Sequence, residues 1–166
     1  MGEDTEITIR PATTEDYDAL CAIIDEVDTL HRERMPHIFR RPPGPVRDRE
    51  YILGLLADDN VGLFVAEVEG QVAGFVHVLV RDAPPWPILV PRRRALVDSL
   101  AVRQEFRRRG IGRALMDRAH AWAAAKGAVD VELNVFEFNQ PALAFYQALG
   151  YGTFARRMVK NLQPLQ

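Results

Sequence analysis

The pattern of apolar and polar residues predicts one short strand and two helices in the first third of the chain. Residues 6–10 alternate between polar and apolar side chains, and Pro11 ends this strand. Thr13 or Thr14 can then cap a helix, because apolar residues follow at helical spacing at positions 20, 23, 24 and 27. A proline-rich break over residues 40–45 separates this helix from a second helix predicted at residues 47–57.

The rest of the pattern predicts a sheet with two further helices. Residues 61–68 and 72–80 are rich in β-branched and apolar side chains, and the short turn around Gly70 indicates a hairpin. A loop with four prolines at residues 84–91 is followed by a predicted strand at 95–102, a helix at 111–126, a strand at 129–135, a helix after Asn139 and a last strand at 151–160. A strand–helix–strand unit normally joins parallel neighbours. The expected fold is α/β (α+β), with a mixed, mostly antiparallel central sheet flanked by helices.

Length and composition favour a single domain spanning residues 1–166. The chain has 166 residues, of which 48% are hydrophobic and 27% charged, as in ordinary globular domains. Its net charge of −2 argues against a nucleic-acid partner, because nucleic-acid-binding domains are usually strongly basic. Cys21 is the one cysteine, which excludes an internal disulfide. The acidic N-terminus does not have the pattern of a signal peptide, and no apolar run reaches ~18 residues, so we expect a cytoplasmic protein without a membrane partner.

The charge is unevenly distributed along the chain. Residues 1–30 hold nine acidic side chains and one basic side chain, Arg10, a local balance of −8. Residues 92–118 hold nine arginines against three acidic residues, a local balance of +6. The nearly neutral total therefore conceals an acidic N-terminal region and a basic middle.

The basic region contains a glycine turn between a predicted strand and a predicted helix. Gly110 and Gly112 let the backbone approach a ligand closely, and the first N–H groups of the helix have no partner within it. The arginines at 107, 108, 109 and 113 would oppose the helix dipole there, unless a polyanion such as a pyrophosphate binds between them. The alternative is a solvated basic loop. The Walker phosphate-binding pattern is absent, and Leu115 stands where a dinucleotide-binding motif needs its third glycine.

Two motifs resemble those of the GNAT superfamily of N-acetyltransferases. The first is R-x-x-G-x-G at residues 107–112, preceded by Leu-Ala-Val at 100–102, which is similar to the family's acyl-CoA-binding motif. The second is N-x-x-A-x-x-x-Y at residues 139–146, followed by Gly150-Tyr151, where the family usually has Gly-Phe. The resemblance is strong over residues 95–152 and only topological before them. It implies a sheet splayed between the strands at 95–102 and 129–135, with acetyl-CoA in the opening.

The resemblance also implies roles for individual residues. Backbone groups of Leu100 and Val102 would pair with the pantetheine arm, and the N–H groups from 108 to 113 would hold the pyrophosphate. Tyr146 would protonate the leaving thiolate, although its helical spacing equally suits a core aromatic residue. The cofactor-binding residues expected on this basis are Leu100, Val102, Arg107, Arg108, Arg109, Gly110, Ile111, Gly112, Arg113, Asn139 and Tyr146.

A residue that accepts the proton of an attacking amine is less clearly indicated. Asp98 is the first candidate, because it alternates with Leu96 and Leu100 and could point inward, where burial would raise its pKa. His77 is the second candidate and Glu132 the third, and a chain of water molecules is an alternative to all three. Each of these side chains could instead have a purely structural role.

The expected activity is transfer of an acetyl group from acetyl-CoA to a primary amine by direct attack. The acceptor is left open between a small amine, an amino acid and a protein N-terminus, and an acyl group longer than acetyl is not excluded. The alternatives are a non-catalytic acyl-CoA-binding module of the same fold and a phosphate or nucleic-acid binder. No metal is expected, since His31 and His37 lack further ligands at suitable spacing. A homodimer is compatible with the pattern, but nothing in the sequence requires one.

Overall fold

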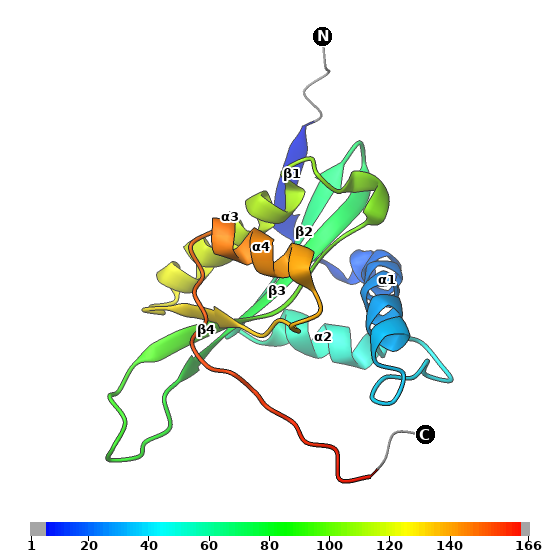
Figure 1. Ribbon diagram of the computed structural model, residues 1–166. Coiled ribbons are helices and arrows are strands. Elements are labelled where there is room, and N and C mark those ends of the chain that lie inside the picture. Colours follow the sequence, from blue (N-terminus) through cyan, green and yellow to red (C-terminus); the bar gives the residue numbers. More distant parts are fainter. Residues whose placement is uncertain (1–5, 164–166) are drawn as a thin grey trace. The chain divides into compact units, whose positions relative to one another are not determined.

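Five strands form one sheet in the order in which they occur along the chain (Figure 1). The computed structural model describes residues 6–163, in which two compact units divide after Asn134 and are treated separately below. The strands belong to the first unit: β1 (Ile7–Pro11), β2 (Val61–Val68), β3 (Gln71–Asp82), β4 (Arg93–Val102) and β5 (Val131–Leu133). Successive strands pair antiparallel from β1 to β4, whereas β4 and β5 are parallel. The predicted mixed, mostly antiparallel sheet is confirmed.

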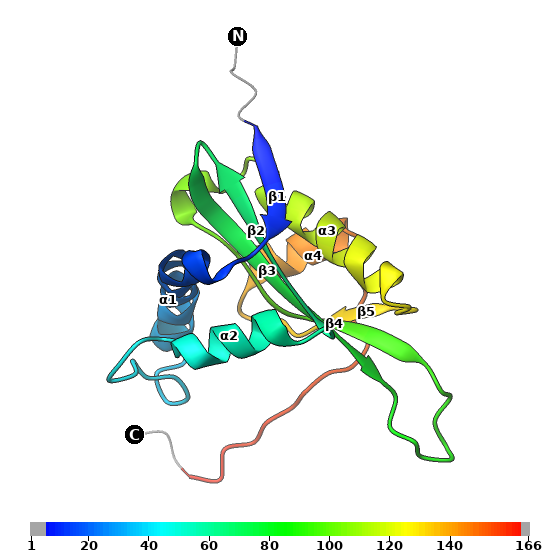
Figure 2. The same ribbon diagram turned by 180° about the vertical axis from the view of Figure 1, so that it is seen from behind.

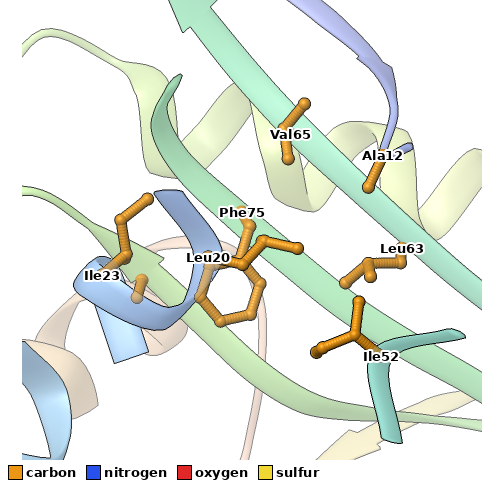
Figure 3. Close-up of a cluster of buried hydrophobic side chains, with 8 residues drawn as sticks. Ala12, Leu20, Ile23, Ile52, Leu63, Val65 and Phe75 are labelled. Carbon is orange, nitrogen blue, oxygen red and sulfur yellow. The ribbon is translucent and has the colours of Figure 1, made fainter. Parts of the chain in front are cut away.

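Helices cover both faces of this sheet. The helices α1 (Tyr17–Arg34) and α2 (Arg49–Ala57) lie on one face, and α3 (Ile111–Ala125) lies on the other (Figures 1 and 2). Side chains of α1 and α2, Leu20, Ile23 and Ile52, pack against strand residues of which Leu63 and Phe75 are examples (Figure 3). Burial of each such side chain contributes on the order of 1.5–3 kcal/mol to the hydrophobic stabilisation of this face.

The opposite face is closed by the apolar side of α3. Leu115, Met116, Ala119 and Ala123 recur at helical spacing and are buried. The indole of Trp122 on the same helix meets the Phe64 ring edge to face, with 6.5 Å between ring centroids. The predicted helix at 111–126 is thus confirmed, and its start lies directly after the glycine turn.

A β-bulge interrupts the pairing of β3 with β4 at Asp98. His77 lies opposite Ser99 and Val78 lies opposite Val97, so that Asp98 is an extra residue with no partner on β3. Phe75 faces α1 and α2, and residues two apart on a strand share a face, so His77 and Ser99 face those helices too. Val97, opposite Val78, faces α3. Because of the extra residue, the odd-numbered residues of β4 face α3 before the bulge and face α1 and α2 after it.

The parallel pairing of β4 with β5 ends early. It joins Ala95 to Val131, Leu96 to Glu132 and Val97 to Leu133, whereas β4 continues to Val102. From Asp98 onward, the edge of β4 that faces away from β3 has no strand beside it in the first unit. Because β5 itself ends at Leu133, the strand predicted over residues 129–135 is shorter in the structure, and the open edge of β4 begins at the bulge.

The second unit, which starts at Val135, contains the helix α4 (Gln140–Ala148). Asn139 caps this helix by accepting a hydrogen bond from the N–H of Ala142 at 3.3 Å, and Pro141 occupies the first turn. The expected strand over residues 151–160 is wrong, because the structure assigns no strand to residues 151–161. Phe154, Met158 and Val159 are instead at least 87% exposed. Their types suit a strand, but a strand also needs a neighbour to pair with.

The expectations from composition concern membrane spans, the number of domains and the location of the protein. None of the helices within residues 6–163 combines the length and the apolar character needed to cross a membrane. The prediction of one domain over residues 1–166 and the prediction of a cytoplasmic location both stay predictions.

Candidate functional site

The glycine turn between β4 and α3 adopts a left-handed backbone at two positions. Gly110, the N-cap of α3, has a φ of 80°, and Arg108 has a φ of 62°. A Cβ at Gly110 would meet no atom within 4 Å, so glycine is needed there for its backbone conformation and not for space. Because glycine has no capping side chain, the N–H groups of Ile111, Gly112 and Arg113 stay open to a ligand at the positive end of the helix.

Seven of the nine arginines of the basic region fall into two groups. Those before β4 and at its start are paired with carboxylates: Arg92 with Asp130, Arg93 with Asp82 at 2.9 Å, and Arg94 with Glu132 at 3.0 Å. Four side chains around the glycine turn are exposed and make no ion pair with any residue between 6 and 163: Arg107, Arg108, Arg109 and Arg113. This second group concentrates uncompensated positive charge at the N-terminus of α3, where a bound anion would be stabilised.

The free edge of β4 ends at the same turn. The N–H of Arg103 donates a hydrogen bond to the carbonyl of Ala73, on the side of β3. Because the backbone groups of successive strand residues point to opposite edges, those of Leu100 and Val102 point to the free edge. The carbonyl of Val102 already accepts a hydrogen bond from Nε of Arg107 at 3.1 Å. The N–H of Val102 and both backbone groups of Leu100 therefore remain for a ligand that runs along the strand.

The bulge turns the side chain of Asp98 toward His77. Nδ1 of His77 lies 3.2 Å from Oδ2 of Asp98, and the hydroxyl of Ser99 lies 3.4 Å from the same oxygen. The His77 side chain is 6% exposed, whereas that of Asp98 is 46% exposed. Asp98 is thus not the inward-facing acid that the alternation predicted, because the extra residue breaks the alternation. The hydrogen bond from His77 holds the pKa of Asp98 below its ordinary value, the reverse of the expected shift.

The loop before α2 supplies a cation on the same side of the sheet. The positive charge of Arg47 adds to the lowering of the pKa of Asp98. Nη1 of Arg47 lies 3.3 Å from a carboxylate oxygen of Asp28 on α1, which compensates its charge. The hydroxyl of Tyr17 donates to the Arg47 carbonyl at 2.7 Å and fixes the loop against α1. Asp98 is therefore bordered by Arg47, which is already paired.

The third candidate for the base, Glu132, is engaged elsewhere. Its carboxylate forms the ion pair with Arg94 on the neighbouring strand. Residues 30–39 comprise the end of α1 and the turn after it, in which the rings of His31 and Phe39 lie 5.4 Å apart. Within residues 6–163 no three His, Cys, Asp or Glu side chains are grouped so that they could hold a metal ion.

In the second unit, the candidate Tyr146 belongs to a cluster of aromatic rings. The ring of Tyr146 on α4 meets Phe145 at 5.2 Å and Tyr151 at 5.8 Å, both edge to face. Burial raises the pKa of Tyr146, so that its phenol is protonated at neutral pH. Burial also raises the pKa of Tyr151, to about 12. Tyr146 therefore has a proton to donate, while the cap by Asn139 gives that residue a structural reason for its place.

The structure thus brings together in the first unit the glycine turn, the unpaired arginines, the free edge of β4 and Asp98. Sequence reasoning missed the contact between His77 and Asp98. It identified the two residues only as separate candidates for the proton acceptor. The only signal in the sequence is that each is the one titratable residue of its predicted strand, at residues 72–80 and 95–102.

Comparison with known proteins identifies relatives for most of the chain. The family model described as Acetyltransferase (GNAT) family matches residues 24–151. An uncharacterized N-acetyltransferase of Methanocaldococcus jannaschii is 37% identical over 103 residues, which make up 62% of this chain and 44% of that protein. The chain therefore matches less than half the length of this relative.

Solved structures share the fold at low sequence identity. A mutant of the protein BH1408 from Bacillus halodurans superposes with a TM-score of 0.90 and 24% identity, covering 94% of this chain and 99% of the other. An aminoglycoside N-acetyltransferase crystallised in complex with CoA superposes with a TM-score of 0.71 and 16% identity, covering 95% of this chain and 100% of the other. At these identities the likeness establishes the fold.

Proposed function

Because this chain belongs to the acetyltransferase (GNAT) family, we propose that it transfers the acetyl group of acetyl-CoA to a primary amine. The observation that carries the proposal is the junction of the free β4 edge with the left-handed Gly110 turn, which Arg107 joins by its bond to the Val102 carbonyl. An extended arm ending in a pyrophosphate matches this junction, because a strand edge suits an amide-containing chain and a helix N-terminus suits phosphate.

The donor would be held by backbone groups and by charge. The pyrophosphate would accept hydrogen bonds from the open N–H groups between residues 108 and 113, among four arginines with no carboxylate partner among the described residues. The amides of the pantetheine arm would pair with Leu100 and with the N–H of Val102. By the resemblance to the family, Asn139 and Tyr146 are also expected to contact the donor.

The chemistry requires no metal, since an amine attacks a thioester directly. The bond from nitrogen to the acetyl carbon forms, and the bond from that carbon to sulfur breaks. The N–H of Val102 can stabilise the oxyanion that develops on the carbonyl. The protonated phenol of Tyr146 can give its proton to the leaving thiolate. The ammonium form of the acceptor must lose one proton before it attacks, and water can accept that proton. The nitrogen loses a second proton after the attack, and that proton can restore the phenol of Tyr146 through water.

Calorimetric titration with acetyl-CoA tests the donor site first. We expect micromolar binding that weakens as salt is raised, and much weaker binding of acetyl-pantetheine, which lacks the nucleotide and its phosphates. Release of free thiol would then be measured over a panel of polyamines, amino acids and peptide N-termini. Binding without turnover of any amine would leave an acyl-CoA-binding module, and absence of binding would overturn the assignment.

A further inference from the structure

We propose that His77 is a positioning residue for the acceptor: its imidazole holds the Asp98 carboxylate at the start of the sheet opening, where Asp98 binds the acceptor amine as an ammonium ion. This inference rests on the proposed acetyl transfer and adds a substrate class, namely an amine that is cationic when it binds. It assigns the two residues different tasks, since Asp98 touches the substrate and His77 acts through Asp98.

The backbone places these two side chains together. Asp98 is the extra residue of the bulge, and the parallel pairing of β4 with β5 stops one residue earlier, at Val97. Asp98 thus lies where the free edge of β4 begins, two residues before Leu100, where the pantetheine arm would begin to pair. A carboxylate on this stretch of β4 is near the end of the arm that carries the thioester. This location is what a binding group for the attacking amine requires.

Exposure separates the two roles. The Asp98 side chain is 46% exposed and can meet a ligand, whereas the His77 side chain is 6% exposed. Nε2 of His77 is buried and has no hydrogen-bond partner among residues 6–163, so the one polar contact of the ring is with Asp98. Since that contact is to a carboxylate, Nδ1 carries the hydrogen and donates it. The buried ring therefore fixes the carboxylate of Asp98 from the protein interior, and the solvent-exposed part of the carboxylate stays free.

The surrounding charges favour a cationic ligand. Arg47 is the arginine whose charge lowers the pKa of Asp98, and it is itself paired with Asp28 at 3.3 Å. Asp28, Arg47 and Asp98 together carry a net charge of −1, so one negative charge remains for an ammonium group. The hydrogen bond from His77 and the charge of Arg47 both keep Asp98 ionised at neutral pH. An ionised carboxylate that binds ammonium is a weak proton acceptor, which is why the amine's proton is assigned to water.

Two substitutions of His77 distinguish positioning from other roles. In His77→Asn the amide nitrogen takes a place close to that of Nδ1, whereas in His77→Gln it lies close to that of Nε2. We expect His77→Asn to keep the KM for a cationic amine within about threefold of the wild-type value. His77→Gln should raise this KM by about tenfold, which corresponds to ~1.4 kcal/mol. The Kd of acetyl-CoA and the value of kcat should change little in both. Thermal unfolding would confirm that both variants are folded.

Asp98→Asn provides a second test at a half-exposed position where misfolding is not expected. It should raise the KM of amines that are cationic at the assay pH by about tenfold or more. It should leave unchanged the KM of a weakly basic amine, such as an aromatic amine, that is neutral at that pH. If both classes of amine were affected equally, the ammonium-binding role of Asp98 would be wrong.

The remaining outcomes are equally decisive. Equal losses of kcat in His77→Asn and His77→Gln would identify His77 as a proton acceptor and overturn the positioning role. An unchanged KM in His77→Gln would remove His77 from acceptor binding. If the wild-type protein acetylates no amine, acetyl transfer fails, but the inference is still tested by nitrogen NMR of the imidazole. A hydrogen on Nδ1 and a shift on titration with a polyamine support it, whereas a hydrogen on Nε2 or no shift contradicts it.

Discussion

Arg10 and Asp16 face each other through two parallel hydrogen bonds, from Nη1 to Oδ2 at 2.8 Å and from Nη2 to Oδ1 at 2.9 Å. The same carboxylate accepts the N–H of Thr13 at 2.8 Å, and Nε of Arg10 reaches Glu67 on β2 at 3.0 Å. The Asp16 side chain is 6% exposed. The pair therefore joins the end of β1, the start of α1 and β2 in a single, partly buried network.

Removing this charge should destabilise the fold. We expect Asp16→Asn to lower the free energy of unfolding by about 2–4 kcal/mol, because the Arg10 charge would lose its main partner. Urea unfolding monitored by circular dichroism measures this. The matched control is Asp82→Asn, which breaks an exposed pair with Arg93 and should cost far less. Similar losses in the two variants would contradict the special role of Asp16.

The same pair predicts how stability changes with pH. The hydrogen bond from Arg10 outweighs desolvation and lowers the pKa of Asp16 in the folded chain. The stability it contributes is present above the pKa of the unfolded chain, near ~4, and is lost as the pH falls through the lower folded value. The wild-type unfolding free energy should therefore fall more steeply below pH ~4 than that of Asp16→Asn. Parallel curves for the two proteins would show that the pKa is not shifted.

Two glycines should respond in opposite ways to replacement by alanine. A Cβ at Gly74 on β3 would lie 2.6 Å from the carbonyl oxygen of Ala101, so Gly74→Ala must push β4 away. We expect a loss of about 1–3 kcal/mol. Gly54 lies within α2 with no atom within 4 Å of its Cβ position, so Gly54→Ala should stabilise by up to about 1 kcal/mol. Melting temperatures of both variants check the two signs, and a neutral Gly74→Ala would show that β4 can yield.

A carboxylate placed in the glycine turn should abolish binding of acetyl-CoA. In Gly112→Glu the new side chain would project from the second residue of α3 and repel the pyrophosphate. The control Ala121→Glu adds the same charge at an exposed position farther along α3 and should bind normally. Calorimetry compares the two. Retained affinity in Gly112→Glu would rule out this turn as the pyrophosphate site.

Loss of the Tyr146 hydroxyl should slow the reaction without weakening donor binding. We expect Tyr146→Phe to lower kcat by about tenfold or more, ~1.4 kcal/mol of barrier, with the Kd of acetyl-CoA nearly unchanged. Tyr151→Phe keeps the same cluster of rings and removes the neighbouring hydroxyl, so its kcat should change by less than about twofold. Equal effects of the two changes would point to packing and not to proton donation.

Local patterns in the sequence predicted the elements well, because each depends on neighbouring residues. The turn at Gly110, the cap at Asn139 and the end of α3 at Ala125 follow from residue types a few positions apart. The absent strand at 151–160 shows the limit of such reasoning. Its residues favour extended structure, but whether a strand forms depends on a pairing partner that local composition does not encode.

The site shows the same limit more sharply. Residues 95–102 have the composition of one continuous strand, and nothing local indicates that Asp98 is an extra residue. The bulge arises from how β4 is paired with β3, and at the bulge Asp98 contacts His77, which lies 21 positions earlier. Sequence reasoning therefore found both residues as candidates but could not predict that they act together, nor that Asp98 would be exposed.

The bulge also separates the place of Asp98 from the pairing of the rest of β4. Without Asp98, Val97 and Ser99 would follow each other opposite Val78 and His77, the partners that they already have. Every other side chain of the strand would keep its layer, with Val97 toward α3 and Ala101 toward α1 and α2. The extra residue is therefore not needed for the packing of the sheet, and its side chain is available for another use.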